Sequence, residues 1–386
     1  MSVRAAEPDR RPRSTRVASR RQIQVGPVPV GGGAPVAVQS MTCTRTGDVA
    51  ATLAQVRALV DAGCEIVRIS VPTAAEVAAF ARVVREAPAL VPGGPLVPIV
   101  ADIHYDWRLA LAAIEAGAAG VRINPGTMAD KHVHEIVRAA AAARVSAGPG
   151  LPEAPVAIRI GVNAGSLPRD LRERATRDAP GALVEAASRW AGQFEAWGYT
   201  DYKLSVKSSS VPDTIAAYRR LADRSAAPLH VGVTEAGTVW SGTIKSAVGI
   251  GALLADGIGD TLRVSLTGDP VEEVRVAWKI LAALGLRRRG PDIISCPTCG
   301  RTEVDVVHLA EEVERRLGSD PALAGSAITV AVMGCRVNGP EEARHADYGI
   351  AAGAGEGVLF DHGERVGTLP EGQLVDALLA LIRGDR

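Results

Sequence analysis

Three cysteines in the last third of the chain have the spacing of metal ligands. Cys296 and Cys299 form a Cys-Pro-Thr-Cys turn, and Cys335 follows in the segment MGCRVNGPEEAR. Closely spaced thiolates ligate zinc or an iron–sulfur cluster. Three thiolates leave one position for a further ligand, and the candidates that follow Cys335 are Glu341, Glu342 and His345. The spacing predicts a metal centre, with zinc and iron–sulfur both open on the residues alone.

The remaining cysteines, Cys43 and Cys64, lie far from this trio. Cys64 follows Gly63, which we expect to end a helix, and is interpreted as a small packed residue. Five cysteines in 386 residues are too sparse for a secreted disulfide framework. We therefore expect a cytoplasmic protein with reduced thiols.

A second group of polar residues stands at the ends of predicted strands, and at least five different strands end in a cation. The group comprises Arg68, Asp102, His104, Arg122, Asn124, Arg159, Asn163, Lys203, Lys207, His230, Glu235, Arg263 and Ser265. A ring of guanidinium and ammonium groups repels itself unless an anion is bound, and both groups suit phosphate or diphosphate. Any one cation could instead form a salt bridge, but their repetition at one structural position predicts a phosphorylated substrate.

Glu235, in the segment GVTEAG, follows the seventh of these strands. A carboxylate among cations stays ionised, and exchanges a proton only when substrate charge raises its pKa. Two roles are open for it on the residues alone: an acid or base in the reaction, or a partner that orients an arginine.

The elements that must position these residues alternate between short β-branched runs and Ala- and Leu-rich helical stretches. The eight predicted strands are Val36–Ser40, Glu65–Ser70, Val97–Asp102, Gly120–Asn124, Val156–Gly161, Tyr202–Val206, Leu229–Val233 and Thr261–Leu266. Eight strands alternating with helices predict a TIM-type (β/α)8 barrel, in which functional residues stand at the carboxyl ends of the strands. A doubly wound open sheet is the alternative, but no G-x-G-x-x-G segment follows the first strand.

An internal repeat supports the barrel. The segments ALVDAGCEIVRIS (58–70), AAIEAGAAGVRIN (112–124) and ALLADGIGDTLRVS (252–265) each read as a helix end, a glycine stop and a strand that ends in Arg-x-Ser or Arg-x-Asn. Glycine just past a helix end is the usual carboxyl-terminal cap. Repetition of this unit is typical of a (β/α)8 barrel.

The barrel pattern breaks at LRRRGPD, which we interpret as a linker. We expect residues 1–22 to be a disordered basic tail, residues 23–288 to be the substrate-binding barrel, and residues 289–386 to be a small α/β domain with the metal centre. The elements expected in that domain are a helix at Asp305–Leu317, a strand at Ile328–Met333, a hairpin-like stretch at Gly349–Gly367 and a helix at Gly372–Ile382.

Composition narrows the class of protein. Lys and Arg total 43, as do Asp and Glu, so the overall charge gives no reason to expect a nucleic acid as partner. No apolar run has the length of a membrane span, and the Arg-rich start of the chain lacks the apolar stretch of a secretory signal.

Ten segments of the chain resemble one family of enzymes, the bacterial 4-hydroxy-3-methylbut-2-enyl diphosphate synthases of the non-mevalonate (MEP) isoprenoid pathway. They are VQSMTCTRTGDV, EIVRISVP, PIVADIH, GVRINPGT, IRIGVNAGSL, LSVKSS, PLHVGVTEAG, GTIKSAVGIGALLADGIGDTLRVSL, ISCPTCGRTEVDV and AVMGCRVNGPEEAR. The similarity runs in order from about Ile23 to about Leu381 and so covers nearly all of the chain.

This resemblance implies a TIM-type barrel followed by a small α/β domain, and an iron–sulfur oxidoreductase that acts on CH or CH2 groups. Its [4Fe–4S] cluster would be held by Cys296, Cys299, Cys335 and Glu342. Two electrons from flavodoxin or ferredoxin would open the ring of 2-C-methyl-D-erythritol 2,4-cyclodiphosphate and remove the C3 hydroxyl as water, giving (E)-4-hydroxy-3-methylbut-2-enyl diphosphate. The resemblance also implies a homodimer, with the cluster domain of one subunit over the barrel mouth of the other.

The resemblance assigns roles to residues already singled out at the strand ends. The implied substrate-binding residues are Arg68, His104, Arg122, Arg159, Asn163, Lys207, Arg263 and Ser265. Glu235 matches the proposed acid or base, which would supply the proton for the departing oxygen.

The chain departs from the family pattern at two places. Many members have Asn-Thr-Asp where this chain has Cys43, Thr44 and Arg45, and many have glycine at the position of Glu341. The second departure places two carboxylates side by side at the implied fourth ligand.

Two other classes of protein would account for part of these patterns. A zinc-stabilised barrel enzyme acting on sugar phosphates, such as an aldolase or isomerase, would also have a basic mouth. An iron–sulfur carrier without enzymatic activity would not need the converging cations.

Overall fold

The computed structural model describes residues 19–90, 96–146, 150, 152–320, 322–323, 325–335 and 339–384. These residues form two compact units, divided between Arg287 and Arg288, one residue before the expected boundary. Each unit has a hydrophobic core of its own.

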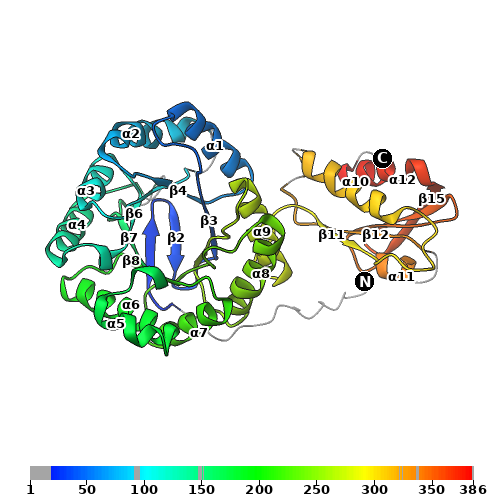
Figure 1. The fold of residues 1–386 in the computed structure, drawn as a ribbon. Helices are drawn as coiled ribbons and strands as arrows, with labels where there is room; N and C mark the ends of the chain where they lie inside the picture. The colour runs from blue at the N-terminus through cyan, green and yellow to red at the C-terminus, as the bar shows by residue number, and fades with distance from the viewer. Residues whose placement is uncertain are drawn as a thin grey trace, which may run out of the picture. The chain divides into compact units, whose positions relative to one another are not determined.

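The first unit is a barrel of parallel strands surrounded by helices (Figure 1). Its strands are β3 (Ala37–Met41), β4 (Ile66–Ser70), β5 (Ile99–Asp102), β6 (Gly120–Ile123), β7 (Ala157–Asn163), β8 (Tyr202–Lys207), β9 (His230–Val231) and β10 (Thr261–Leu262). They pair in the order β8-β7-β6-β5-β4-β3-β10-β9, and a parallel bridge between Leu204 and Leu229 joins the two ends of the sheet. The predicted (β/α)8 barrel is confirmed, and each predicted strand overlaps an observed one.

Helices form the outer ring of the barrel in Figure 1. They are α1 (Val49–Asp61), α2 (Val77–Glu86), α3 (Trp107–Glu115), α4 (Asp130–Ala142), α5 (Arg169–Ala175), α6 (Ala179–Ala196), α7 (Val211–Ala222), α8 (Val239–Ala255) and α9 (Pro270–Ala283). Local sequence fixes several of their ends. Asp48 and Asp106 cap the first turns of α1 and α3 through their carboxylates.

The glycines of the internal repeat end helices, as the repeat predicts. Gly63, Gly117 and Gly257 follow α1, α3 and α8 with φ values of 98°, 88° and 74°. This left-handed conformation is accessible to glycine at little cost, so each helix stops and the chain turns into the next strand.

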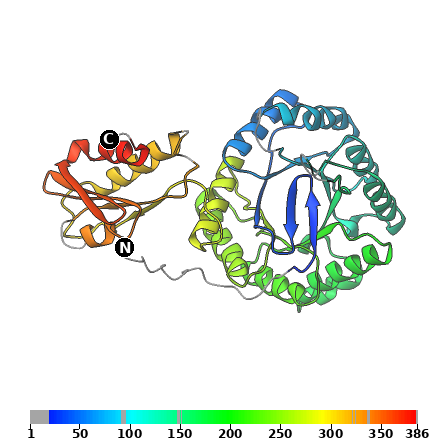
Figure 2. The same ribbon diagram turned by 180° about the vertical axis from the view of Figure 1, so that it is seen from behind.

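A hairpin that the sequence patterns did not reveal covers one end of the barrel (Figures 1 and 2). Strands β1 (Gln22–Val25) and β2 (Val28–Gly31) pair antiparallel. Their apolar side chains pack on residues at the amino ends of the barrel strands. This cluster comprises Ile23, Val25, Val28 and Val30 of the hairpin with Ala37, Ile66, Val100, Ala119 and Ala157. The end opposite to the strand carboxyl termini is therefore closed.

The structure differs from the expected basic tail at residues 19–22. Ser19 Oγ donates a hydrogen bond of 2.6 Å to Asp260, and Arg21 pairs with Glu195 at 2.9 Å. Gln22 begins β1. Residues 1–18 lie outside the described residues.

The second unit contains a five-stranded sheet in the order β11-β12-β13-β14-β15. Its strands are β11 (Asp292–Ser295), β12 (Thr329–Met333), β13 (Tyr348–Gly353), β14 (Glu356–Asp361) and β15 (Glu364–Pro370). The first three are parallel and the last two pair antiparallel with their neighbours. The expected hairpin-like stretch is this antiparallel part, whereas β11 was not expected as a strand.

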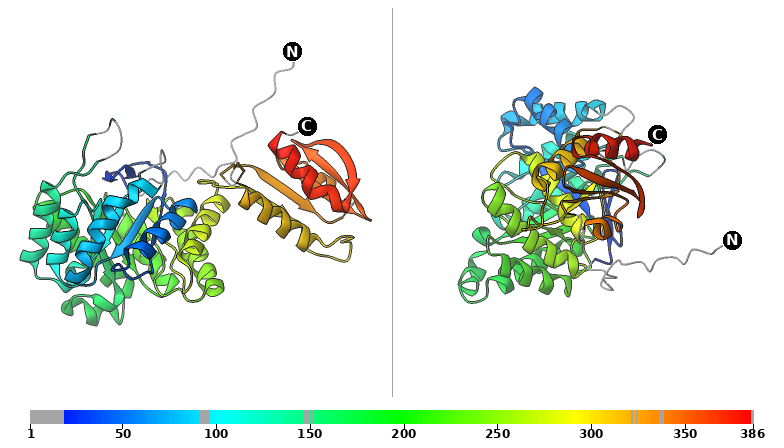
Figure 3. Two further views of the ribbon diagram at one scale, coloured as in Figure 1. Left: turned by 90° about the horizontal axis from the view of Figure 1, so that it is seen from above. Right: turned by 90° about the vertical axis from the view of Figure 1, so that its right-hand side faces the viewer.

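Helices cover both faces of this sheet. Helices α10 (Val306–Ser319) and α12 (Leu374–Arg383) pack on one face, over Val330, Val332 and Ile350 (Figure 3). The short helix α11 (Gly339–Ala343) packs against β12 and β13, in a separate cluster with Ala331, Met333 and Ala351. Because side chains alternate along a strand, α11 lies on the other face.

No helix among the described residues is both long and apolar enough to cross a membrane.

Candidate functional site

Four charged residues lie side by side across neighbouring barrel strands. The parallel register pairs Asp102 of β5 with Arg122 of β6, Arg122 with Arg159 of β7, and Arg159 with Lys203 of β8. All four are buried, with exposed fractions of 2–5%. The layer carries three cations and one carboxylate, so the barrel interior has an excess of positive charge.

Asp102 is the carboxylate that these cations share. Its oxygens lie 3.9 Å from Arg68 Nη1, 3.5 Å from Arg122 Nη1 and 3.3 Å from His104 Nε2. Burial opposes ionisation, but Arg68, His104, Arg122 and Arg159 outweigh it and hold the pKa of Asp102 far below its ordinary value. Asp102 is thus a fixed negative charge that draws Arg68, His104 and Arg122 together.

Arg122 makes contacts in two directions. Its Nη1 lies 3.2 Å from the ring nitrogens of His104. With the Asn163 amide turned so that both of its polar atoms are satisfied, the Asn163 oxygen accepts from Arg122 Nη2 at 3.2 Å. Three of the predicted substrate-binding residues, His104, Arg122 and Asn163, therefore meet at one place.

Burial, together with the excess positive charge, lowers the pKa values of the cations. Burial lowers the pKa of Arg68 to about 10 and that of Lys203 to about 7, with repulsion from neighbouring arginines adding to the effect. Burial and neighbouring cations also lower the pKa values of Arg159 and Lys207 well below their ordinary values. An anion bound at the mouth would reverse this effect.

Several donors of these cations have no acceptor. Within the described part of the chain, Arg122 Nε, Arg159 Nε and Lys203 Nζ are buried without a hydrogen-bond partner. Buried polar groups are costly when unpaired, and such groups cluster where a ligand supplies the missing partner. This is the strongest structural sign of an anion site.

Lys207 extends from β8 towards β9. Its Nζ lies 3.4 Å from His230 Nε2, and His230 Nδ1 lies 2.8 Å from Thr261 Oγ1. Burial, together with Arg159 and the two lysines, lowers the pKa of His230 well below its ordinary value. A neutral His230 accepts from Lys207 and donates to Thr261, which holds the lysine in place.

Arg263 is held by a carboxylate that no sequence pattern singled out. Glu273, in the first turn of α9, accepts from Arg263 Nη2 at 3.0 Å and Nε at 3.2 Å, and from Ser40 Oγ at 2.8 Å. Glu273 is 97% buried and the Arg263 side chain is one-fifth exposed. Ser265 follows β10 and is half-buried. Arg263 thus has a fixed orientation at the strand end.

Glu235 follows β9 and has an exposed side chain. Its backbone φ is +53°, a left-handed conformation that costs a residue other than glycine about 1 kcal/mol or more. Among the described residues its carboxylate has no hydrogen bond or ion pair, so it does not orient an arginine here.

Two of the three candidate ligand cysteines share one edge of the second sheet. Cys296 follows β11, and Cys335 follows β12, its parallel neighbour. The backbone N–H of Gly334 donates to Cys296 Sγ at 3.3 Å. Such bonds to sulfur stabilise the charge of a thiolate ligand, so these two thiols suit an iron–sulfur cluster in their chemistry.

Cys299 and Glu342 do not form a metal-binding group with Cys296 and Cys335 in this structure. Cys299 is exposed, and Thr302 holds its backbone through a 3.0 Å hydrogen bond from Cys299 N to the threonine hydroxyl. No three His, Cys, Asp or Glu side chains form a metal-sized group in the ranges that the structure describes. Residues 336–338, between Cys335 and α11, lie outside those ranges.

The two adjacent carboxylates of α11 differ in their partners. Glu341 pairs with Arg344 at 3.6 Å. The Glu342 carboxylate is exposed and has no partner among the described residues. The arrangement therefore favours Glu342 over Glu341 as the side chain available to a metal.

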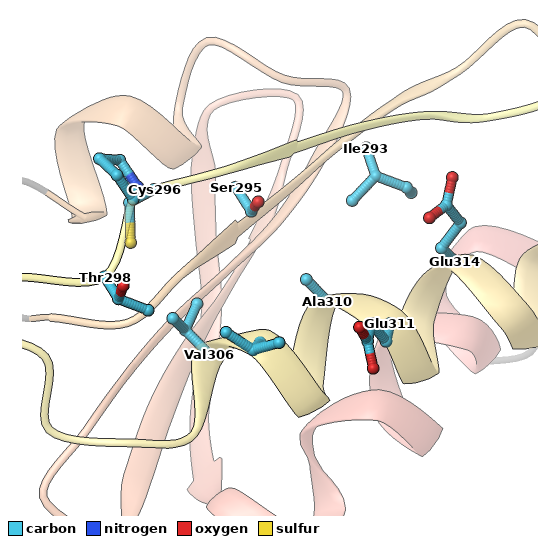
Figure 4. Close-up of a pocket in the computed structure, with 10 residues that line it drawn as sticks. Ile293, Ser295, Cys296, Thr298, Val306, Ala310, Glu311 and Glu314 are labelled. Atoms are coloured by element: carbon cyan, nitrogen blue, oxygen red, sulfur yellow. The ribbon is translucent and has the colours of Figure 1, made fainter. Parts of the chain in front are cut away.

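A pocket of about 380 Å³ lies between β11 and α10, beside Cys296 (Figure 4). Ile293, Ser295 and Cys296 line it from the strand side, and Glu311 and Glu314 lie on the helix side. Its cysteine belongs to the candidate metal centre already described.

The remaining cysteines have separate environments. Cys64 is buried in the barrel core, and burial raises the pKa of its thiol to about 12. This agrees with a packed, unreactive residue. Cys43 is exposed and its sulfur accepts from Gln55 Nε2 at 3.2 Å.

Comparisons with known proteins agree with both units. Residues 20–278 match the model of the GcpE TIM-barrel domain, and residues 292–384 match that of the GcpE protein C-terminal domain. The chain is 53% identical to a protein of Geobacter sulfurreducens over 94% of its own length and 97% of the relative's. It is 47% identical to one of Aquifex aeolicus over 94% and 96%. Both relatives are named 4-hydroxy-3-methylbut-2-en-1-yl diphosphate synthase (flavodoxin).

Proposed function

Because the chain belongs to the GcpE family, we propose that it catalyses the reaction for which its relatives are named, the flavodoxin-dependent formation of 4-hydroxy-3-methylbut-2-enyl diphosphate. It is thus an oxidoreductase of isoprenoid biosynthesis by the MEP pathway. The observation that carries the proposal is the layer of buried, incompletely paired cations inside the barrel, which suits a diphosphate and no neutral substrate.

The proposed substrate is 2-C-methyl-D-erythritol 2,4-cyclodiphosphate, which the enzyme opens and dehydroxylates by reduction. Its diphosphate would accept hydrogen bonds from Arg122 and Arg159, whose Nε atoms have no acceptor among the described residues, and from Lys207, whose Nζ lies 3.4 Å from His230 Nε2. Arg263, oriented by Glu273, would bind from the opposite side of the barrel together with Ser265. Fixed cations of this kind hold a reacting group in place and neutralise charge that develops on it.

Glu235 is the proposed proton donor for the oxygen that leaves as water. Its exposed carboxylate stands at the strand ends without a competing partner. His104, whose ring lies 3.3 Å from Asp102 and 3.2 Å from Arg122, is the second group from which a proton could come.

The cofactor of the proposal is a [4Fe–4S] cluster held by Cys296, Cys299, Cys335 and Glu342. When bound, the cluster would pass electrons from flavodoxin or ferredoxin to the substrate one at a time. The support is the chemistry of three thiols with a carboxylate that follows Cys335 in the sequence, and the adjacent strands that Cys296 and Cys335 follow. Glu342 is a harder and more easily displaced ligand than a thiolate.

The proposal includes a homodimer whose active site lies between subunits, and a cytoplasmic location. The support for the dimer is the family resemblance, and the support for the location is the sparse, metal-spaced set of cysteines.

Substitution of one ligand tests the function. Cys335→Ser, purified without oxygen, should lack bound iron and brown colour and should not turn over the cyclodiphosphate with a reduced viologen dye, because an alcohol does not replace a thiolate on iron. Cys43→Ser is the matched control and should keep both. Full iron content and turnover in Cys335→Ser would exclude the cluster assignment, and a colourless wild-type protein that contains zinc would favour the zinc enzyme.

A further inference from the structure

Two glycines, one on a barrel strand and one just after another strand, lie beside the cations of the anion site. Gly161 lies on β7 between Arg159 and Asn163, on the inward face that the three share. A Cβ atom built on Gly161 would lie 2.8 Å from Arg122 Nε, 3.2 Å from its Nη2 and 3.4 Å from its Cζ. The three nearest atoms thus all belong to one guanidinium.

Arg122 reaches this place by leaning across the strand. In the register it stands opposite Arg159, two residues before Gly161. The far end of the side chain is tied to Asp102 and His104 through Nη1 and to Asn163 through Nη2. A methyl group at residue 161 would collide with the middle of this arrangement, at the Nε whose hydrogen has no acceptor among the described residues.

We propose that Gly161 is a positioning residue of the substrate site. Because residue 161 has no side chain, the Arg122 guanidinium can lie beside its backbone and point at the diphosphate. The inference rests on the proposed function, in which Arg122 binds that group. Gly161 does not itself touch substrate and acts through Arg122.

Gly232, which follows β9, stands in the same relation to Lys207. A Cβ there would lie 2.7 Å from Lys207 Nζ. It would also lie 2.5 Å from the backbone oxygen of Arg263, which cannot move without separating β9 from β10. A substitution at Gly232 therefore combines two effects, whereas the three atoms nearest to a Cβ at Gly161 all belong to the Arg122 side chain.

The expected result for Gly161→Ala is a folded enzyme with a displaced guanidinium. We expect the dissociation constant of the cyclodiphosphate to rise about tenfold to a hundredfold, the range for loss of one charge-assisted contact. Iron content and the urea midpoint of unfolding should stay close to wild type. Gly192→Ala is the control, because Gly192 is exposed on α6 and its Cβ would meet nothing within 4 Å.

A double-mutant cycle with Arg122→Ala separates positioning from a general effect on the barrel. Substrate affinity and KM are measured for the wild type, Gly161→Ala, Arg122→Ala and the double variant, each loaded with its cluster. If Gly161 acts through Arg122, adding Gly161→Ala to Arg122→Ala should cause no further loss. An equal loss in both backgrounds would overturn the inference.

The remaining outcomes distinguish the inference from the function on which it rests. Unchanged affinity in Gly161→Ala, with weaker binding in Arg122→Ala, would overturn the positioning role and leave the proposed function intact. Unchanged affinity in Arg122→Ala would remove Arg122 from the substrate site, and the inference with it. If Gly161→Ala fails to fold, recovery of folding in the double variant supports the collision with Arg122, and failure of both overturns it.

Discussion

At the scale of single residues, the two exposed carboxylates Glu235 and Glu342 are chemically alike and differ only in their surroundings. Glu235 follows a barrel strand, and Glu342 lies on a short helix behind Cys335. Replacement by glutamine removes the charge of either and keeps its size, so each variant reports on what the carboxylate does.

The two variants should fail differently. Glu342→Gln should alter the electron paramagnetic resonance of the reduced protein or remove one iron, because an amide is a weaker ligand than a carboxylate. Glu235→Gln should keep the spectrum and substrate binding but lower turnover by about 10²–10⁴ if a general acid is lost. An unchanged spectrum in Glu342→Gln would shift the assignment to Glu341, and normal turnover in Glu235→Gln would leave His104 or water as the proton source.

Lys203 gives a pH dependence with a defined sign. Burial and repulsion from Arg159 and Arg68 lower its pKa to about 7, with Asp260 opposing them. The unfolded chain keeps the ordinary lysine pKa near 10.4, so between about pH 7 and pH 10 it binds more protons than the folded chain. The free energy of unfolding of the substrate-free protein should therefore rise with pH across this interval. Below about pH 7, Lys203 is charged in the folded protein, and its burial lowers the free energy of unfolding by the full amount.

Urea unfolding measured at several pH values between about 7 and 10 checks this expectation. Lys203→Met, of similar volume, should be more stable than the wild type near neutral pH and should show a smaller rise with pH. Binding of the diphosphate should be accompanied by proton uptake, measured by calorimetry in buffers of different ionisation enthalpy. A Lys203→Met protein with the wild-type pH profile would contradict the assignment.

At the scale of elements, the β1–β2 hairpin does not pair with the barrel strands. Its apolar side chains instead fill the end of the barrel at which the strands begin. Ile23, Val25 and Val30 are at most 3% exposed. The hairpin thus shields the apolar residues at the amino ends of the barrel strands from water.

Ile23→Ala should destabilise the barrel unit by about 2–5 kcal/mol, the usual cost of a buried isoleucine-to-alanine change. The measurement is the urea midpoint of the barrel transition. Val366→Ala, at a half-exposed position of β15, is the control and should change little. A midpoint of Ile23→Ala equal to that of the control would show that the hairpin does not support the barrel.

At the scale of the whole molecule, the proposed dimer makes a prediction that a self-contained monomer does not. Cys296→Ser has an intact barrel and a defective cluster domain, whereas Arg122→Ala has the reverse. The two proteins are unfolded, mixed and reassembled with iron and sulfide, and are assayed at a substrate concentration too low for Arg122→Ala to bind. A mixed dimer would then combine one intact barrel with one intact cluster domain.

Such mixing should restore about a quarter of wild-type activity, since about half of the dimers are mixed and one of their two sites is intact. Each variant carried through the same procedure alone is the control. Activity no higher than that of the separate variants would mean that each subunit completes its own site.

The sequence by itself determined the barrel strands and their order, because hydrophobic runs and helix-ending glycines such as Gly63, Gly117 and Gly257 are local signals. It also determined the metal-ligand spacing of Cys296 and Cys299, and the positions of Arg122 and Lys207 near strand ends, whereas Arg159 lies inside β7, four residues before its end. The hairpin was missed because its strands are short and its contacts lie on residues far along the chain.

Only the tertiary structure decided which of these polar residues are paired. Glu273 holds Arg263 from helix α9, a contact that no sequence pattern indicated, whereas Arg122 Nε and Lys203 Nζ are left without acceptors among the described residues. Gly161 acquires its relation to Arg122 only through the register of β6 and β7. The type of each side chain is a property of the sequence. Its pairing, its burial and the free space around it depend on which strands lie next to one another in the closed barrel.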